Sequence, residues 1–105
     1  MIHLEQKGYE TLAFNYTFGK YEVDLIMRDG DTVVAVEVKG RSTPDYGLPQ
    51  DFLKRGQIKR IVQATDHFMQ NEYPHDHEVR FDFVGIIQNK AGTSYEHLED
   101  AFFHF

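Results

Sequence analysis

Residues 21–41 of the chain read YEVDLIMRDGDTVVAVEVKGR, and this stretch decides the fold. Tyr21 to Arg28 and Thr32 to Lys39 alternate apolar with other residues at a period of two, which is typical of β-strands. The Asp29-Gly30-Asp31 segment between them is a strong signal for a tight turn. The stretch therefore predicts an antiparallel β-hairpin.

The turn of this hairpin sets which side chains share a face. A two-residue loop at Asp29-Gly30 faces Glu22 with Glu37, and one at Gly30-Asp31 faces Asp24 with Glu37. A three-residue loop would place Glu37 on the face opposite to Glu22 and Asp24. With a two-residue loop, one face carries Glu22, Asp24, Glu37 and Lys39, and the other carries the core positions Val23, Leu25, Met27, Val34, Val36 and Val38.

Three acids on one face of a hairpin need a positive partner, because like charges opposed in a sheet are destabilising. Lys39 supplies one charge, and a divalent cation would supply the rest. Hard cations such as Mg²⁺ prefer oxygen ligands, and a bound metal activates water and polarises a phosphodiester. The ammonium group of Lys39 could orient the attacking water or stabilise the transition state. Alternation alone favours a simpler alternative, a half-exposed strand face with surface ion pairs.

The rest of the chain surrounds the hairpin with further elements. Tyr9 to Phe18 mixes aromatic and β-branched residues and predicts a strand, and Glu78 to Ile87 predicts a central one. From Gln57 to Asn71 the apolar residues recur at helical spacing. Met1 to Lys7 is typical of the last turns of a helix, and Ser94 to Phe102 predicts a short strand or helix.

This order of elements predicts an α/β fold at the border with α+β. We expect a mixed β-sheet with an antiparallel three-strand start, flanked by helices. The crossover from Lys39 through a helix to Glu78 makes those two strands parallel. With 105 residues the chain fits one domain, which we assign to residues 1–105.

Composition excludes several classes of protein. The chain has no cysteine, which removes disulfide scaffolds, thiolate nucleophiles and cysteine-ligated metal sites. No apolar run approaches the roughly 20 residues that cross a bilayer, and the start lacks the regions of a signal peptide. We therefore expect a cytoplasmic protein without a membrane partner.

The net charge of −6 argues at first against a nucleic-acid partner, since phosphate binding depends on Lys and Arg. Between Lys39 and Arg60, however, basic residues outnumber acidic ones. Such a segment is either a local phosphate-binding surface or an ordinary solvated helix face, and charge alone favours the second. Later in the chain, Arg80 and Asp82 are expected to pair with each other.

A family resemblance changes this balance. Asp24, followed after a short hairpin by Val36-Glu37-Val38-Lys39, resembles the PD-(D/E)XK motif of the restriction-endonuclease-like nucleases. The chain resembles the YraN family of predicted bacterial endonucleases, and this resemblance covers nearly its whole length. Its further segments are Lys7-Gly8-Tyr9-Glu10, Asn15-Tyr16, Tyr21 to Ile26, Gly40-Arg41-Ser42, Val79 to Gly85 and Glu96 to Phe102.

The resemblance implies a restriction-endonuclease-like fold, similar to that of Holliday-junction resolvases, and cleavage of DNA with Mg²⁺ or Mn²⁺. It implies that Asp24 and Glu37 are metal ligands, that Lys39 is the catalytic ammonium and that Glu22 is an auxiliary acid. Branched DNA is one expected substrate, and a homodimer is the expected assembly for cutting both strands. Residues expected near the phosphates are Arg41, Lys54, Arg55, Gln57 and Lys59.

The chain departs from the family at two places, and the first departure, together with the net acidic charge, favours an alternative. The family usually has an earlier helix with a further acidic residue, and we expect part of that N-terminal helix to be missing here. The family also tends to carry Lys where this chain has Gln57, whose amide would orient a phosphate or a carboxylate. The alternative is a catalytically incomplete module of the same fold that binds nucleic acid or another protein.

Overall fold

The structure of the protein is a computed structural model that describes residues 2–41, 55–73 and 78–101. Two helices and five strands occupy these ranges, close to the predicted positions. No helix among them is long and apolar enough to cross a membrane. The elements are α1 (Ile2–Glu5), β1 (Glu10–Phe18), β2 (Tyr21–Asp29), β3 (Thr32–Arg41), α3 (Arg55–Asn71), β4 (Glu78–Asn89) and β5 (Gly92–Leu98).

β2 and β3 form the predicted antiparallel hairpin. Asp29 faces Thr32, so the loop is Gly30-Asp31 and the second of the two predicted registers is the observed one. Gly30 has a φ of 61°, the positive value that a type II′ turn requires at its first central position. The ladder of paired residues continues to Leu25 and Val36 and ends there, immediately before Asp24 and Glu37.

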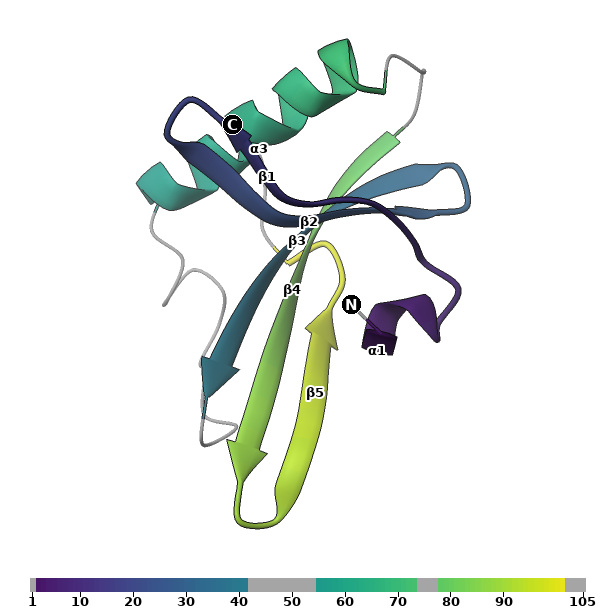
Figure 1. Cartoon of the computed structure of the whole chain (residues 1–105), viewed down its shortest axis with the longest axis vertical. Coiled ribbons are helices and arrows are strands. Elements are labelled where there is room, and N and C mark those ends of the chain that lie inside the picture. The colour runs from purple at the N-terminus through teal and green to yellow at the C-terminus, as the bar shows by residue number, and fades with distance from the viewer. Residues whose placement is uncertain (1, 42–54, 74–77, 102–105) are drawn as a thin grey trace.

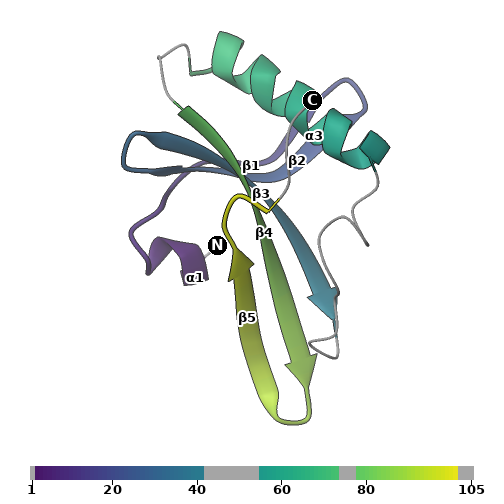
Figure 2. The same ribbon diagram turned by 180° about the vertical axis from the view of Figure 1, so that it is seen from behind.

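The five strands form one sheet in the order β1-β2-β3-β4-β5. β2 pairs antiparallel with both β1 and β3, β3 and β4 are parallel, and β5 returns antiparallel to β4. The predicted fold class is therefore confirmed, and the arrangement is consistent with a restriction-endonuclease-like α+β fold. Figures 1 and 2 show α3 beside β1 and β2, while β3, β4 and β5 extend away from it as a long twisted ribbon.

Apolar side chains are buried on both faces of β2 and β3. Ile26 and Ala35 belong with Phe68 of α3 to one buried cluster. Met27 belongs with Leu4 of α1 to a second cluster on the opposite face. Even-numbered and odd-numbered positions of these strands both carry apolar residues. One face of the sheet is covered by α3, and part of the other face is covered by α1.

This arrangement corrects one expected face assignment. Val23, which was predicted to share the core face of Leu25, packs in the cluster of α3, whereas Leu25 packs in the cluster of α1. The alternation of side chains along β2 is therefore interrupted at Asp24, and Val23 and Ile26 point to the same face of the sheet. This change lies beside an irregular residue of β1, Asn15, which sits between the partners of Val23 and Leu25 and has a φ of 52°. A positive φ of this kind bends an edge strand and its neighbour.

Candidate functional site

The carboxylates of Asp24 and Glu37 lie where β2 separates from β3. The backbone N–H of Val38 donates to Oδ2 of Asp24 over 2.9 Å, and the backbone N–H of Asp24 donates to Oε1 of Glu37 over 3.4 Å. Each carboxylate thus accepts from an N–H group beyond the end of the β2–β3 ladder, where backbone donors need other partners. β3 continues alongside β4 as far as Arg41, so it is β2 that turns away.

Gln57 of α3 holds Glu37 from the helix side. Its Nε2 donates to Oε2 of Glu37 over 3.3 Å, so the amide contacts a carboxylate, one of the two roles expected for it. Glu37 is buried, with 7% of the residue exposed, and Asp24 is partly buried. The interpretation of this strand face as solvated is therefore wrong at Glu37.

Burial and the nearby charge of Asp24 change the acidity of Glu37. Burial is the larger cause, and the negative Asp24 adds to it; together they raise the pKa of Glu37 to about 7. The hydrogen bonds from Gln57 and from the backbone of Asp24 act in the opposite direction but are weaker. Glu37 therefore changes its protonation near neutral pH, and a cation beside it would favour the ionised form.

The pair has the chemistry of a site for a hard divalent cation. Within the described ranges, no Lys or Arg forms an ion pair with either carboxylate. Among the same residues, no third Asp, Glu or His joins the pair closely enough to complete a metal-binding group. Mg²⁺ is commonly held by one or two carboxylates, with waters and phosphates completing its shell, so Asp24 and Glu37 fit such an ion.

Among the described residues, neither of the other predicted catalytic residues, Lys39 and Glu22, forms a hydrogen bond or an ion pair with these two carboxylates. Lys39 is half-buried and follows Glu37 by two residues on β3, so strand alternation places it on the same face. In the described part of the chain, no ion pair joins Lys39 to Asp24 or Glu37. Glu22 is exposed and pairs with Thr17 of β1. Since the neighbouring Val23 points to the α3 face, Glu22 lies on the other face, and the prediction that it shares a face with Asp24 and Glu37 is wrong.

Four of the predicted phosphate-binding residues lie at the end of β3 or in the first turns of α3. Arg41 is the last residue of β3 and Arg55 is the first of α3, while Lys59 is exposed on the first turns of α3. Lys54 lies outside the described residues. The structure thus brings Gln57 to the carboxylate pair and leaves Lys59 toward solvent.

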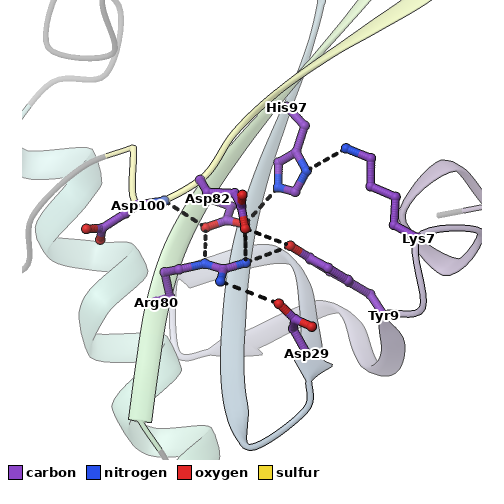
Figure 3. Close-up of polar contacts among 8 residues, drawn as sticks. Lys7, Tyr9, Asp29, Arg80, Asp82, His97 and Asp100 are labelled. Atoms are coloured by element: carbon purple, nitrogen blue, oxygen red, sulfur yellow. Dashed lines mark hydrogen bonds and ion pairs between the residues drawn. The ribbon is translucent and has the colours of Figure 1, made fainter.

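A second polar cluster lies on the opposite face of the sheet, around Asp82 of β4 (Figure 3). Asp82 is fully buried and accepts from Nε and Nη2 of Arg80 over 2.8 and 3.0 Å. It also accepts from Nε2 of His97 over 2.7 Å and from the backbone N–H of Asp100 over 3.0 Å. The predicted pairing of Arg80 with Asp82 is confirmed, and the part played by His97 was not foreseen.

Residues around Arg80 extend this cluster toward α1. Tyr9 accepts from Nη2 of Arg80 over 2.7 Å, and burial, the largest cause, raises the pKa of Tyr9 to about 12. Nζ of Lys7 lies 3.0 Å from Nδ1 of His97. A carboxylate has about four acceptor positions, and Asp82 uses four donors of its own chain. The cluster therefore leaves no open ligand position and ties β4, β5 and the segment after α1 together.

Comparisons with known proteins agree on one family. The model of "Uncharacterised protein family UPF0102" matches residues 1–86. A UPF0102 protein of Christiangramia forsetii is 52% identical over 103 residues, covering 98% of this chain and 86% of the relative. A UPF0102 protein of Flavobacterium psychrophilum is 42% identical, covering 97% of this chain and 85% of the relative. One of Syntrophus aciditrophicus is 38% identical over 95% of this chain and 79% of its own.

Proposed function

We propose that this chain, which belongs to the uncharacterised protein family UPF0102, is a metal-dependent nuclease domain that binds DNA and hydrolyses its phosphodiesters. The narrower identification with the YraN family and with the restriction-endonuclease-like nucleases is part of this proposal. The observation that carries it is the pair of carboxylates, Asp24 and Glu37, in the fork between β2 and β3.

In this proposal Asp24 and Glu37 hold one Mg²⁺ or Mn²⁺, which when bound activates water and polarises the phosphodiester. The two acids repel each other when both are ionised, and a cation between them relieves that repulsion. Because the pKa of Glu37 is raised to about 7, metal binding near neutral pH displaces a proton from this group. The ammonium of Lys39 stabilises the charge of the transition state, and Glu22 is an auxiliary acid.

The proposed substrate is DNA, including branched DNA, in the cytoplasm. Phosphates beside the carboxylate pair are held by basic residues that lie in sequence at the end of β3 and around the start of α3. Exposed Lys59 of α3 is one of them, and the others are Arg41, Lys54 and Arg55. A homodimer would place two such sites on the two strands of a duplex.

One observation favours a second candidate function. Within the described ranges, no third Asp, Glu or His completes the metal-binding group at Asp24 and Glu37. A chain whose metal site is incomplete would retain the fold and the basic residues without hydrolysis. The second candidate is therefore a non-catalytic module that binds nucleic acid or another protein.

Cleavage assays with Mn²⁺ separate these functions. Junction, flap and linear DNA are incubated with the wild type, with Lys39→Ala and with Lys90→Ala, which removes an exposed lysine in the turn after β4. We expect cleavage by the wild type and Lys90→Ala and a loss of about 10²–10³-fold in Lys39→Ala. Equal cleavage by all three proteins would assign the activity to a contaminant or to another site, and no cleavage by any would favour the module.

A further inference from the structure

A hollow of about 240 Å³ opens on the α3 side of the molecule, apart from the carboxylate pair. One end of β1 and one side of α3 line it. Its volume is below the roughly 300–1,000 Å³ of pockets that hold drug-sized ligands, and suits one planar ring system. The lining residues are Phe18, Gln63, Asp66, His67 and Gln70.

An aromatic pair forms one wall of the hollow. Phe18 is 41% exposed, and its ring stacks on that of His67, with centroids 4.0 Å apart and planes 12° from parallel. Nδ1 of His67 lies 2.6 Å from the hydroxyl of Tyr16, whose ring packs edge-on against Phe68. The buried core thus fixes the orientation of His67, and through it the orientation of Phe18.

Polar side chains stand beside this aromatic pair. Gln63, His67 and Gln70 follow one another at helical spacings of four and three residues, so they share one side of α3. Among the described residues, the amides of Gln63 and Gln70 make no hydrogen bond. Each amide offers both donors and an acceptor, and Asp66 adds a carboxylate acceptor.

We propose that this hollow binds one unpaired nucleobase of the DNA substrate. The base stacks on Phe18 beside His67, while Gln63, Gln70 and Asp66 bond its edge. Flat aromatic side chains combined with amides and carboxylates are the groups that bind bases taken out of a duplex. This inference rests on the proposed function and adds the substrate class, which is DNA with unpaired nucleotides close to the cleaved bond.

The position of the hollow relative to the carboxylate pair supports this substrate. Gln57 contacts Glu37, and His67 lies ten residues further along α3, which at about 1.5 Å per residue is about 15 Å. At about 3.4 Å for each stacked nucleotide, the two places are about four nucleotides apart. Flaps, bulges and junctions between single and double strands bring unpaired bases within that span.

Binding of a fluorescent base analogue tests the inference. Single-stranded and bulged oligonucleotides carrying 2-aminopurine are titrated with the full chain in EDTA, so that hydrolysis plays no part. We expect quenching by the wild type, tighter binding than to a matched duplex, and a loss of about five- to a hundred-fold in Phe18→Ala. The matched control is Phe14→Ala, which removes a 70% exposed ring of the same strand outside the hollow and should bind as the wild type does.

Two further variants keep the test decisive. Phe18→Leu retains an apolar side chain without a π face and should lose affinity as Phe18→Ala does. Gln63→Ala with Gln70→Ala leaves the aromatic pair intact and should also weaken binding. Unchanged affinity in these variants, an equal loss in Phe14→Ala, or equal binding of single strand and duplex would overturn the inference.

The outcomes also separate this inference from the proposed function. Base binding in EDTA without cleavage in Mn²⁺ would retain the hollow as a base site and reject hydrolysis. Cleavage that is lost in Lys39→Ala, with base binding unaffected in Phe18→Ala, would retain the nuclease and reject the base site. If sedimentation showed a dimer that Phe18→Ala dissociates, the aromatic wall would be the contact of a second copy and the inference would be wrong.

Discussion

The backbone N–H of Asp24 donates to the carboxylate of Glu37 across the fork between β2 and β3. The carboxylate of Asp24 in turn accepts from Val38 of the opposite strand. Two acids that repel each other are thus held in place by the main chain of both strands. This arrangement orients them before any ligand arrives, as a preformed metal site requires.

The raised pKa of Glu37 predicts how stability depends on pH. The folded protein keeps this proton up to about pH 7, whereas the unfolded chain releases it near the ordinary pKa of 4.5. The folded state binds more protons between these values, so the stability contributed by this group falls as the pH rises from 4.5 to about 7.

Glu37→Gln removes this pH dependence. Without metal, we expect the variant to gain stability relative to the wild type as the pH rises through that window, by at most about 3 kcal/mol. Urea unfolding in EDTA at several pH values measures the difference between the two proteins, which cancels the titration of the other carboxylates. Parallel curves for the wild type and the variant would show that Glu37 has an ordinary pKa.

The burial of Val36 predicts that a single charge at this position unfolds the protein. Its side chain is fully buried in the cluster that β2 and β3 share with α1, and its register partner on β4 is the buried Asp82, so a second carboxylate there meets a like charge. Val36→Asp places a carboxylate there, and the cost exceeds the few kcal/mol that a small domain can lose. We expect no cooperative thermal transition in Val36→Asp, whereas Thr93→Asp on the exposed side of β5 melts as the wild type does. A near-native melt of Val36→Asp would contradict the assignment of this face to the core.

The burial and the hydrogen bonds of Asp82 predict that its substitution also lowers the stability of the fold. Asp82→Asn keeps the shape of the side chain but removes the buried charge that faces Arg80 and His97, and leaves Arg80 with only the more exposed Asp29 and Glu99 as ionic partners. Leaving buried donors without their charged acceptor costs about 1–3 kcal/mol. Glu10→Gln is the matched control, because its ion pair with Arg28 is exposed and contributes little. Equal denaturation midpoints for the two variants would mean that the Asp82 cluster does not stabilise the fold.

The sequence predicted the hairpin and the opposed acids because local chemistry determines both. Gly30 allows a two-residue turn, and that turn sets the register which opposes Asp24 to Glu37. The parallel pairing of β3 with β4 followed from the crossover helix between them. These features depend on residues that are close in the chain or on connection rules.

The remaining features depend on contacts between distant segments. The change of face at Val23 lies beside Asn15 of β1, whose φ is positive, and the alternation within β2 does not predict it. Gln57 meets Glu37 only because α3 packs on that face of the sheet. His97 reaches Asp82 from β5, fifteen residues further along the chain. Neither composition nor hydrophobic periodicity predicts these contacts.

Calorimetric titration with Mn²⁺ tests the central claim that Asp24 and Glu37 form a metal site. The wild type, Asp24→Asn and the exposed control Glu10→Gln are titrated near neutral pH, with and without DNA. We predict one ion bound per chain by the wild type and by Glu10→Gln, with release of a proton, and no binding by Asp24→Asn. Binding by Asp24→Asn equal to that of the wild type, or no binding by the wild type even with DNA present, would contradict the account.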